Sequence, residues 1–95
     1  MQKVLLIDAS SNKEIKVGIR IDKKEYEMRK KIGYQKAQVV LPTIDKLLRQ
    51  YAIGIRDLTS IQVNTGPGSF TGIRVGMAIA NALSFALKIP VKKIK

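Results

Sequence analysis

The first third of the chain carries the residue pattern of β-strands. Residues 4–7 form a continuous apolar run that ends at Asp8, which is typical of a strand buried on both faces. Residues 14–21 alternate strictly, with isoleucine or valine at every odd position, and so predict a strand with one buried face. Residues 24–31 alternate more weakly and are rich in lysine, which suits the edge of a sheet. The connections are short and polar, so we expect an antiparallel meander.

The hydrophobic period changes to that of a helix further along. Apolar side chains recur every three or four residues from Ala37 to Tyr51, which defines one buried helix face. Pro42 lies inside this pattern and has no amide to donate to the preceding turn, so we expect a kink or a loosely wound opening. Gly54 is the expected stop signal. A short β-branched run at 61–64 then predicts a central strand.

A second helix is predicted from about Thr71 to Leu87, followed after Pro90 by a last short strand at 91–95. We expect Thr71 to cap this helix and Phe70 to staple its first turn by contact with Val75. The predicted core stripe consists of Val75, Ile79, Leu83 and Leu87.

The opposite side of the second helix is also small or apolar. A helix with this composition is normally covered on more than one side, although scattered surface hydrophobic residues need no partner. We therefore predict a partner-binding surface on this helix, made of Ile73, Arg74, Met77, Ala78, Asn81 and Phe85.

The predicted order of elements is βββαβαβ. An α/β protein with this order, two long helices and a mixed five-stranded sheet has the ribonuclease H-like (actin-like, ASKHA) topology, here as a single lobe. We expect residues 1–95 to form one domain.

The charge of the chain is strongly positive, with 18 lysine and arginine residues against 7 acidic ones and a formal net charge of +11. This balance favours polyanions or acidic partners, although a genome that favours lysine codons produces the same excess. The candidate RNA contacts cluster around the third strand and its exit, at Lys23, Lys24, Arg29, Lys30, Lys31 and Lys36.

The absence of cysteine and histidine excludes disulfides, zinc–thiolate sites and histidine bases. The N-terminal apolar run is too short for a signal peptide. The best membrane candidate, residues 76–87, falls short of the ~20 residues that a spanning helix needs. We therefore expect a cytoplasmic protein with no membrane segment and no metal.

A glycine-rich loop joins the short central strand to the second helix: Gly66, Pro67, Gly68, Ser69, Phe70, Thr71 and Gly72. Loops of this kind at a helix N-terminus are typical of phosphate sites. This loop carries no lysine, however, and its glycines match neither G-x-x-x-x-G-K-[ST] nor G-x-G-x-x-G. Phosphate binding is therefore disfavoured.

A second interpretation is a ribonuclease H-type nuclease, because Asp8 ends the first strand, where such enzymes keep a metal-binding carboxylate. Two-metal hydrolysis requires several carboxylates at one site. Here the fourth strand ends in Asn64, no acid opens the first helix, and Asp45 and Asp57 fall elsewhere. We expect no catalytic residue.

The run from Gly66 to Gly76, GPGSFTGIRVG, resembles the signature of the TsaB (YeaZ) family. Residues 7–10, IDAS, resemble the end of the family's first strand, and Leu41-Pro42 with Ile44 resembles its L-P-x-[IV] helix. The resemblance covers essentially the whole chain. It implies a non-catalytic protein that pairs with TsaD, and with TsaE in bacteria, to make threonylcarbamoyladenosine (t6A) in tRNAs that read ANN codons.

Pairing in this family is implied to run through the two long helices, which adds Val39 and Thr43 of the first helix to the candidate partner-binding residues. The resemblance therefore implies a scaffold subunit that docks a TsaD-like enzyme, and a TsaE-like protein with it, or that forms a homodimer when alone. The alternatives are a small basic tRNA-binding module and a truncated fragment of a two-lobed TsaB, because family members carry a second lobe. No nucleotide cofactor is expected, because residues 8–11 read DASS where the actin-like phosphate loop reads D-x-G-[ST].

Overall fold

A computed structural model describes residues 2–32 and 36–94 of the chain. The elements follow the predicted order: β1 (Lys3–Asp8), β2 (Glu14–Ile21), β3 (Lys24–Lys31), α1 (Lys36–Gln50), the 3-10 turn η1 (Ile55–Asp57), β4 (Ser60–Asn64), α2 (Phe70–Leu87) and β5 (Val91–Ile94). The predicted last residue of the final strand, Lys95, lies outside the described residues.

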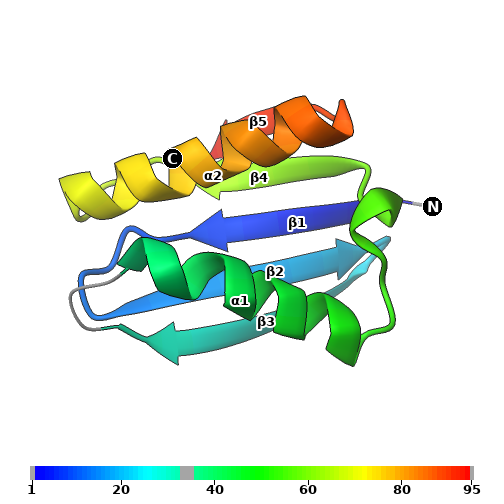
Figure 1. The fold of residues 1–95 in the computed structure, drawn as a ribbon, viewed down its shortest axis with the longest axis horizontal. Helices are drawn as coiled ribbons and strands as arrows, with labels where there is room; N and C mark the ends of the chain where they lie inside the picture. Colours follow the sequence, from blue (N-terminus) through cyan, green and yellow to red (C-terminus); the bar gives the residue numbers. More distant parts are fainter. Residues whose placement is uncertain (1, 33–35, 95) are drawn as a thin grey trace.

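The five strands form one mixed sheet in the order β3-β2-β1-β4-β5. β1, β2 and β3 are the predicted antiparallel meander, and β1, β4 and β5 run parallel. Both helices lie on the same face of this sheet, α1 mainly over β2 and α2 mainly over β4 (Figure 1). α1 continues through Pro42. The fold prediction is therefore confirmed.

The hydrophobic core fills the space between the helices and one face of the sheet. Leu5 and Ile7 of β1 belong to it and are almost fully buried. Leu6, which points to the other face, is only partly buried and lines an open hollow. The prediction that β1 is buried on both faces is therefore wrong for Leu6, because both helices cover the same side.

The start of α2 also differs from the prediction. Ser69, not Thr71, is the N-cap, and its hydroxyl accepts a hydrogen bond from the Gly72 amide at 3.2 Å. Phe70 is therefore the first residue of the helix, and its exposed fraction is 73%. Because a staple requires the residue before the cap, Phe70 cannot staple Val75 and faces solvent instead.

Small residues bring α2 close to the sheet. Its buried positions are Gly72, Gly76 and Ala80. A Cβ atom added to Gly76 would lie 3.5 Å from a methyl group of Val63 and 3.6 Å from the Cβ of Ala9, so the helix backbone itself packs on β4 and β1. The residues predicted as the core stripe flank this face and are only partly buried: Val75, Ile79, Leu83 and Leu87.

α1 ends before the predicted stop signal. The left-handed residue after the helix is Ala52, with φ of +55°, and not Gly54. The Ile53 amide donates to the Leu48 carbonyl at 2.9 Å, which is the bond that closes a Schellman C-cap. Gly54 instead precedes η1 with an ordinary extended backbone.

Candidate partner-binding helix and its glycine loop

The glycine loop is fixed to the end of β1 by backbone contacts. The Ser69 amide donates to the Ser10 carbonyl at 2.6 Å. Gly68, with φ of +156°, lies directly over this residue, and a Cβ atom added to Gly68 would lie 2.5 Å from the Ser10 carbonyl oxygen and 2.7 Å from its Cβ. Only glycine fits this position without displacing the backbone.

A polar network at the ends of β1 and β4 supports the same contact. Asp8 Oδ1 accepts hydrogen bonds from the Ser10 amide at 3.0 Å and the Ser10 hydroxyl at 2.5 Å. Asn64 Nδ2 donates to the Ser10 hydroxyl at 3.5 Å, while Asn64 Oδ1 accepts from the Gly66 amide at 2.9 Å. The ends of β1 and β4 are thereby tied to each other and to the first glycine of the loop.

The ionisation of Asp8 reflects this environment. Partial burial raises the pKa of Asp8, but the hydrogen bonds from Ser10 and Asn64, together with the charge of Lys16, outweigh that effect. The pKa is therefore lowered from its ordinary value of 3.8, because hydrogen bonds stabilise the carboxylate form.

The geometry of the loop bears on the two disfavoured interpretations. The amides of Gly66, Ser69 and Gly72 donate within the chain, so they are not available to a phosphate group. Asp8 is engaged in the network around Ser10, and within residues 2–32 and 36–94 no three acidic side chains gather into a metal-binding group. The contacts of the loop and of Asp8 therefore hold the start of α2 against the ends of β1 and β4.

The outer face of α2 is the most exposed apolar surface that the described residues form. Phe85 is 86% exposed and Phe70 is 73% exposed. The guanidinium of Arg74 lies 5.4 Å from the centre of the Phe70 ring, which is a cation–π contact. Ala78 and Asn81 are exposed between the two aromatic residues. We call these five residues (Phe70, Arg74, Ala78, Asn81 and Phe85) the outer stripe of α2.

The structure places the other predicted partner-binding residues differently. Thr43 is only 7% exposed, and its hydroxyl donates to the Val39 carbonyl at 2.7 Å. Val39 and Met77 are partly buried and pack against the core, and Ile73 is partly buried. Thr43 therefore offers no side chain to a partner, because it is buried and its hydroxyl is hydrogen-bonded within α1.

Sequence reasoning missed three exposed apolar positions, Phe70, Leu41 and Ile55. Phe70 continues the outer stripe, a placement that its spacing of four from Arg74 signals. Leu41 and Ile55, which are 51% and 43% exposed, border a hollow of about 280 Å³ between α1 and η1. No periodic signal marks Ile55, because η1 is a single turn.

The candidate RNA contacts around β3 differ in whether they form ion pairs with acidic side chains. Arg29 forms ion pairs with Glu14 and Glu27, both at 3.3 Å, so its charge is compensated. The other described members of the set are exposed and have no acidic partner within the described residues: Lys23, Lys24, Lys30 and Lys31. The side chain of Lys36 lies outside what the structure describes.

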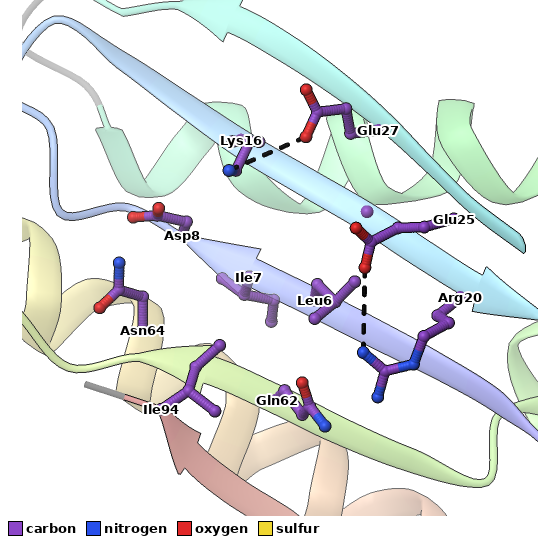
Figure 2. Close-up of a pocket in the computed structure, with 11 residues that line it drawn as sticks. Leu6, Ile7, Asp8, Lys16, Arg20, Glu25, Glu27, Gln62, Asn64 and Ile94 are labelled. Atoms are coloured by element: carbon purple, nitrogen blue, oxygen red, sulfur yellow. Dashed lines mark ion pairs between the residues drawn. The ribbon is translucent and has the colours of Figure 1, made fainter. Parts of the chain in front are cut away.

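The sheet face without helices carries a hollow of about 370 Å³ (Figure 2). Ion pairs cross it from β2 to β3, between Lys16 and Glu27 and between Arg20 and Glu25, each at 3.8 Å. Leu6 supplies apolar surface between the strands. Because these charges are paired, the hollow lacks the excess positive charge that the lysines around the edge strand β3 carry.

α2 is also long and apolar enough, by length and composition, to cross a membrane, since the qualifying segment covers all 18 of its residues. The helix is longer than the segment 76–87 that the sequence indicated, because it begins at Phe70. The criterion alone is weak, because core helices also meet it. In this structure α2 packs lengthwise on the sheet through Gly72, Gly76 and Ala80.

Comparison with known proteins assigns the chain to a family. It is 35% identical over 88 residues to the tRNA threonylcarbamoyladenosine biosynthesis protein TsaB of Buchnera aphidicola subsp. Schizaphis graminum, across 93% of this chain and 41% of that protein. It is 31% identical over 94 residues to TsaB of Bacillus subtilis, across 96% of this chain and 40% of that protein. The family model TsaD, tRNA N6-adenosine threonylcarbamoyltransferase, matches residues 32–95. The chain belongs to this family, on its TsaB (YeaZ) branch.

Solved structures agree with this assignment. YeaZ from Pseudomonas aeruginosa superposes with a TM-score of 0.92 at 27% identity, across all of this chain and 44% of that one. RuvC from Thermus thermophilus superposes with a TM-score of 0.65 at 11% identity, a likeness of fold alone that supports the ribonuclease H-like class. The chain thus spans about two-fifths of the length of its TsaB relatives.

Proposed function

We propose that this chain is a non-catalytic accessory subunit of the t6A tRNA-modification machinery and that it docks a TsaD-like enzyme through α2. The relatives that it matches are named as threonylcarbamoyladenosine biosynthesis proteins. The observation that carries the proposal is the outer stripe, where Phe70 and Phe85 are both largely exposed. Exposed aromatic side chains of this size mark protein interaction sites.

TsaB proteins carry a second lobe, so this chain represents only one part of such a subunit. We propose that residues 1–95 correspond to the N-terminal lobe of a TsaB protein, since they cover about two-fifths of the relatives' length. On this proposal the lobe holds the docking helix. A TsaE-like protein is a further proposed member of the same complex.

The experiment is a pull-down of the TsaD-like enzyme of the same organism with the tagged 95-residue chain. Ala78→Arg places a large cation in the middle of the outer stripe and should abolish the interaction. Gln50→Arg is the matched control, because it adds the same charge at an exposed position near the end of α1 and should bind as the parent does. Retention of the enzyme by the Ala78→Arg chain would refute docking through this surface.

A second candidate function rests on the four uncompensated lysines of β3 and the turn before it. They are suited to phosphate contacts, so the accessory subunit would also contribute positive charge to tRNA binding. The Tyr26 ring stacks on Tyr51 with the ring centres 4.3 Å apart, so it is already occupied. A tRNA contact made by the described residues of this region is therefore electrostatic rather than a base-stacking interaction.

A further inference from the structure

The sheet has one long open edge, formed by β3. This strand lies at one end of the strand order β3-β2-β1-β4-β5 and along the margin of the sheet in Figure 1. It pairs with β2 over all eight of its residues, whereas β5 at the opposite edge has four residues. The backbone amide and carbonyl groups of an edge strand are a template for pairing with another extended segment.

The hydrogen-bonding register shows which residues of β3 direct these backbone groups outward. The Ile32 amide donates to the Lys13 carbonyl at 3.0 Å, so these two residues form a hydrogen-bonded pair directly beyond the paired strands. Hydrogen-bonded and non-hydrogen-bonded pairs alternate along an antiparallel ladder. Every second residue of β3 therefore turns its amide and carbonyl away from β2: Glu25, Glu27, Arg29 and Lys31. Within residues 2–32 and 36–94 no other strand pairs with this edge.

The side chains on the helix-bearing face of β3 form a short, regular pattern. Tyr26 and Met28 pack against the core but are only partly buried. Lys24 and Lys30 flank them on the same face, because alternate residues of a strand share a face. Neither lysine forms an ion pair with an acidic side chain of the described residues. This side of the edge therefore presents an apolar centre between two cations.

We propose that β3 binds an acidic, extended segment of a partner protein, which adds a sixth strand to the sheet. On the helix-bearing face this segment carries acidic residues beside Lys24 and Lys30 and apolar residues beside Tyr26 and Met28. Opposite-charge and apolar cross-strand pairs both stabilise a sheet. The backbone hydrogen bonds supply affinity, and the alternate side chains supply specificity.

Charge determines which segment fits this edge. Lysines along an edge strand prevent it from pairing with an identical edge, because like charges directly opposite each other destabilise a sheet. On the face without helices, Glu25, Glu27 and Arg29 already form ion pairs within the chain, so uncharged residues suit the segment there. An acidic segment turns the repulsion at Lys24 and Lys30 into attraction, and the formal net charge of +11 favours its approach.

A fluorescently labelled peptide with the sequence Glu-Thr-Val-Thr-Val-Thr-Glu tests the proposal by anisotropy with the 95-residue chain. It places acids beside Lys24 and Lys30 and valines beside Tyr26 and Met28. The peptide Thr-Glu-Val-Thr-Val-Glu-Thr has the same composition but carries its acids on the other face, so it should bind roughly tenfold more weakly. N-methylation of every second residue blocks the hydrogen bonds of one peptide edge. One of the two alternately methylated peptides should therefore lose binding while the other keeps it.

A matched pair of variants tests the same hydrogen bonds from the side of the protein. Glu27→Pro removes an outward amide and leaves the ladder with β2 in place, since proline is tolerated where the amide of an edge strand faces solvent. Glu27→Ala removes the same carboxylate and keeps the amide. The alanine variant should therefore bind the peptide roughly threefold to tenfold more tightly than the proline variant.

Two results would overturn the proposal. One is equal binding of the two peptides of identical composition, with tRNA displacing both, because this would indicate a charged surface suited to nucleic acid rather than a strand-pairing edge. The other is equal binding of the two alternately methylated peptides, a result that does not depend on how the protein variants fold. The pull-down with Ala78→Arg tests the proposed function separately, because α2 lies over β4 and away from β3.

Discussion

The substitution Gly68→Ala tests whether the glycine loop is a structural lock on α2. Its added Cβ would meet the Ser10 backbone oxygen at 2.5 Å and the Ser10 Cβ at 2.7 Å. Neither atom is the end of a flexible side chain, so the loop or the end of β1 must move. The residue would also keep φ of +156°, and strained backbone of this kind costs about 1–3 kcal/mol. We expect a loss of at least about 2 kcal/mol in the free energy of unfolding, a typical value for backbone effects.

Thermal and urea unfolding monitored by circular dichroism measure this loss. For a domain of this size, 2 kcal/mol corresponds to a fall in Tm of roughly 8–16 °C. Gly54→Ala is the control, because Gly54 has φ of −78° and an added Cβ would meet only the Asp57 carboxylate, at 3.1 Å. If the two variants unfold within about 2 °C of each other, the contact between Gly68 and Ser10 is not the constraint that the structure indicates.

Three further predictions test the end of α1, the ionisation of Asp8 and the lysines of β3. Ala52→Gly should raise the free energy of unfolding by about 0.5–1 kcal/mol, because glycine adopts the left-handed conformation that ends α1 without strain, and urea unfolding checks it. Asp8→Asn should be less stable than the parent at neutral pH, and this difference should vanish in acid. The lowered pKa of Asp8 contributes stability at pH values above the ordinary value of 3.8, and this stability is lost as the pH falls through the folded-state pKa. Unfolding midpoints of the two proteins, measured from pH 7 to about pH 2.5, should therefore converge, and a constant difference would contradict the prediction. Any affinity for tRNA should fall with added salt. In a filter-binding series, the double change Lys30→Gln and Lys31→Gln should reduce the slope of log affinity against log salt concentration by about 2. Arg29→Gln removes a paired charge and should change this slope less.

The sequence predicts the fold well where the hydrophobic period is unambiguous. Strict alternation in residues 14–21 and helical spacing from Ala37 onward gave the elements in the right order, and the lysines of β3 correctly indicated a sheet edge. The burial of β1 was harder to predict, because an apolar run does not tell which face the helices cover. Leu6 could be placed only once both helices were seen on the other side of the sheet.

The site was predicted less completely, for two physical reasons. Small residues give no hydrophobic signal, so the sheet-facing side of α2, where Gly76 and Ala80 are buried, was assigned to larger neighbours. Capping is decided by backbone geometry, and both Ser69 and Thr71 suit a cap by residue type. The choice of Ser69 turns Phe70 from a staple into an exposed residue of the outer stripe.

The most characteristic residues of the family signature are therefore not the ones that a partner would touch. Gly68 and Ser69 fix the loop to Ser10, and Asn64 fixes the start of the loop to the same site, while the exposed residues of the outer stripe begin at Phe70. Because α2 starts one residue after this lock, a small shift of the loop moves the whole outer stripe relative to the sheet. A change in the loop should thus weaken partner binding without removing a single contact, which distinguishes a positioning role from a direct one.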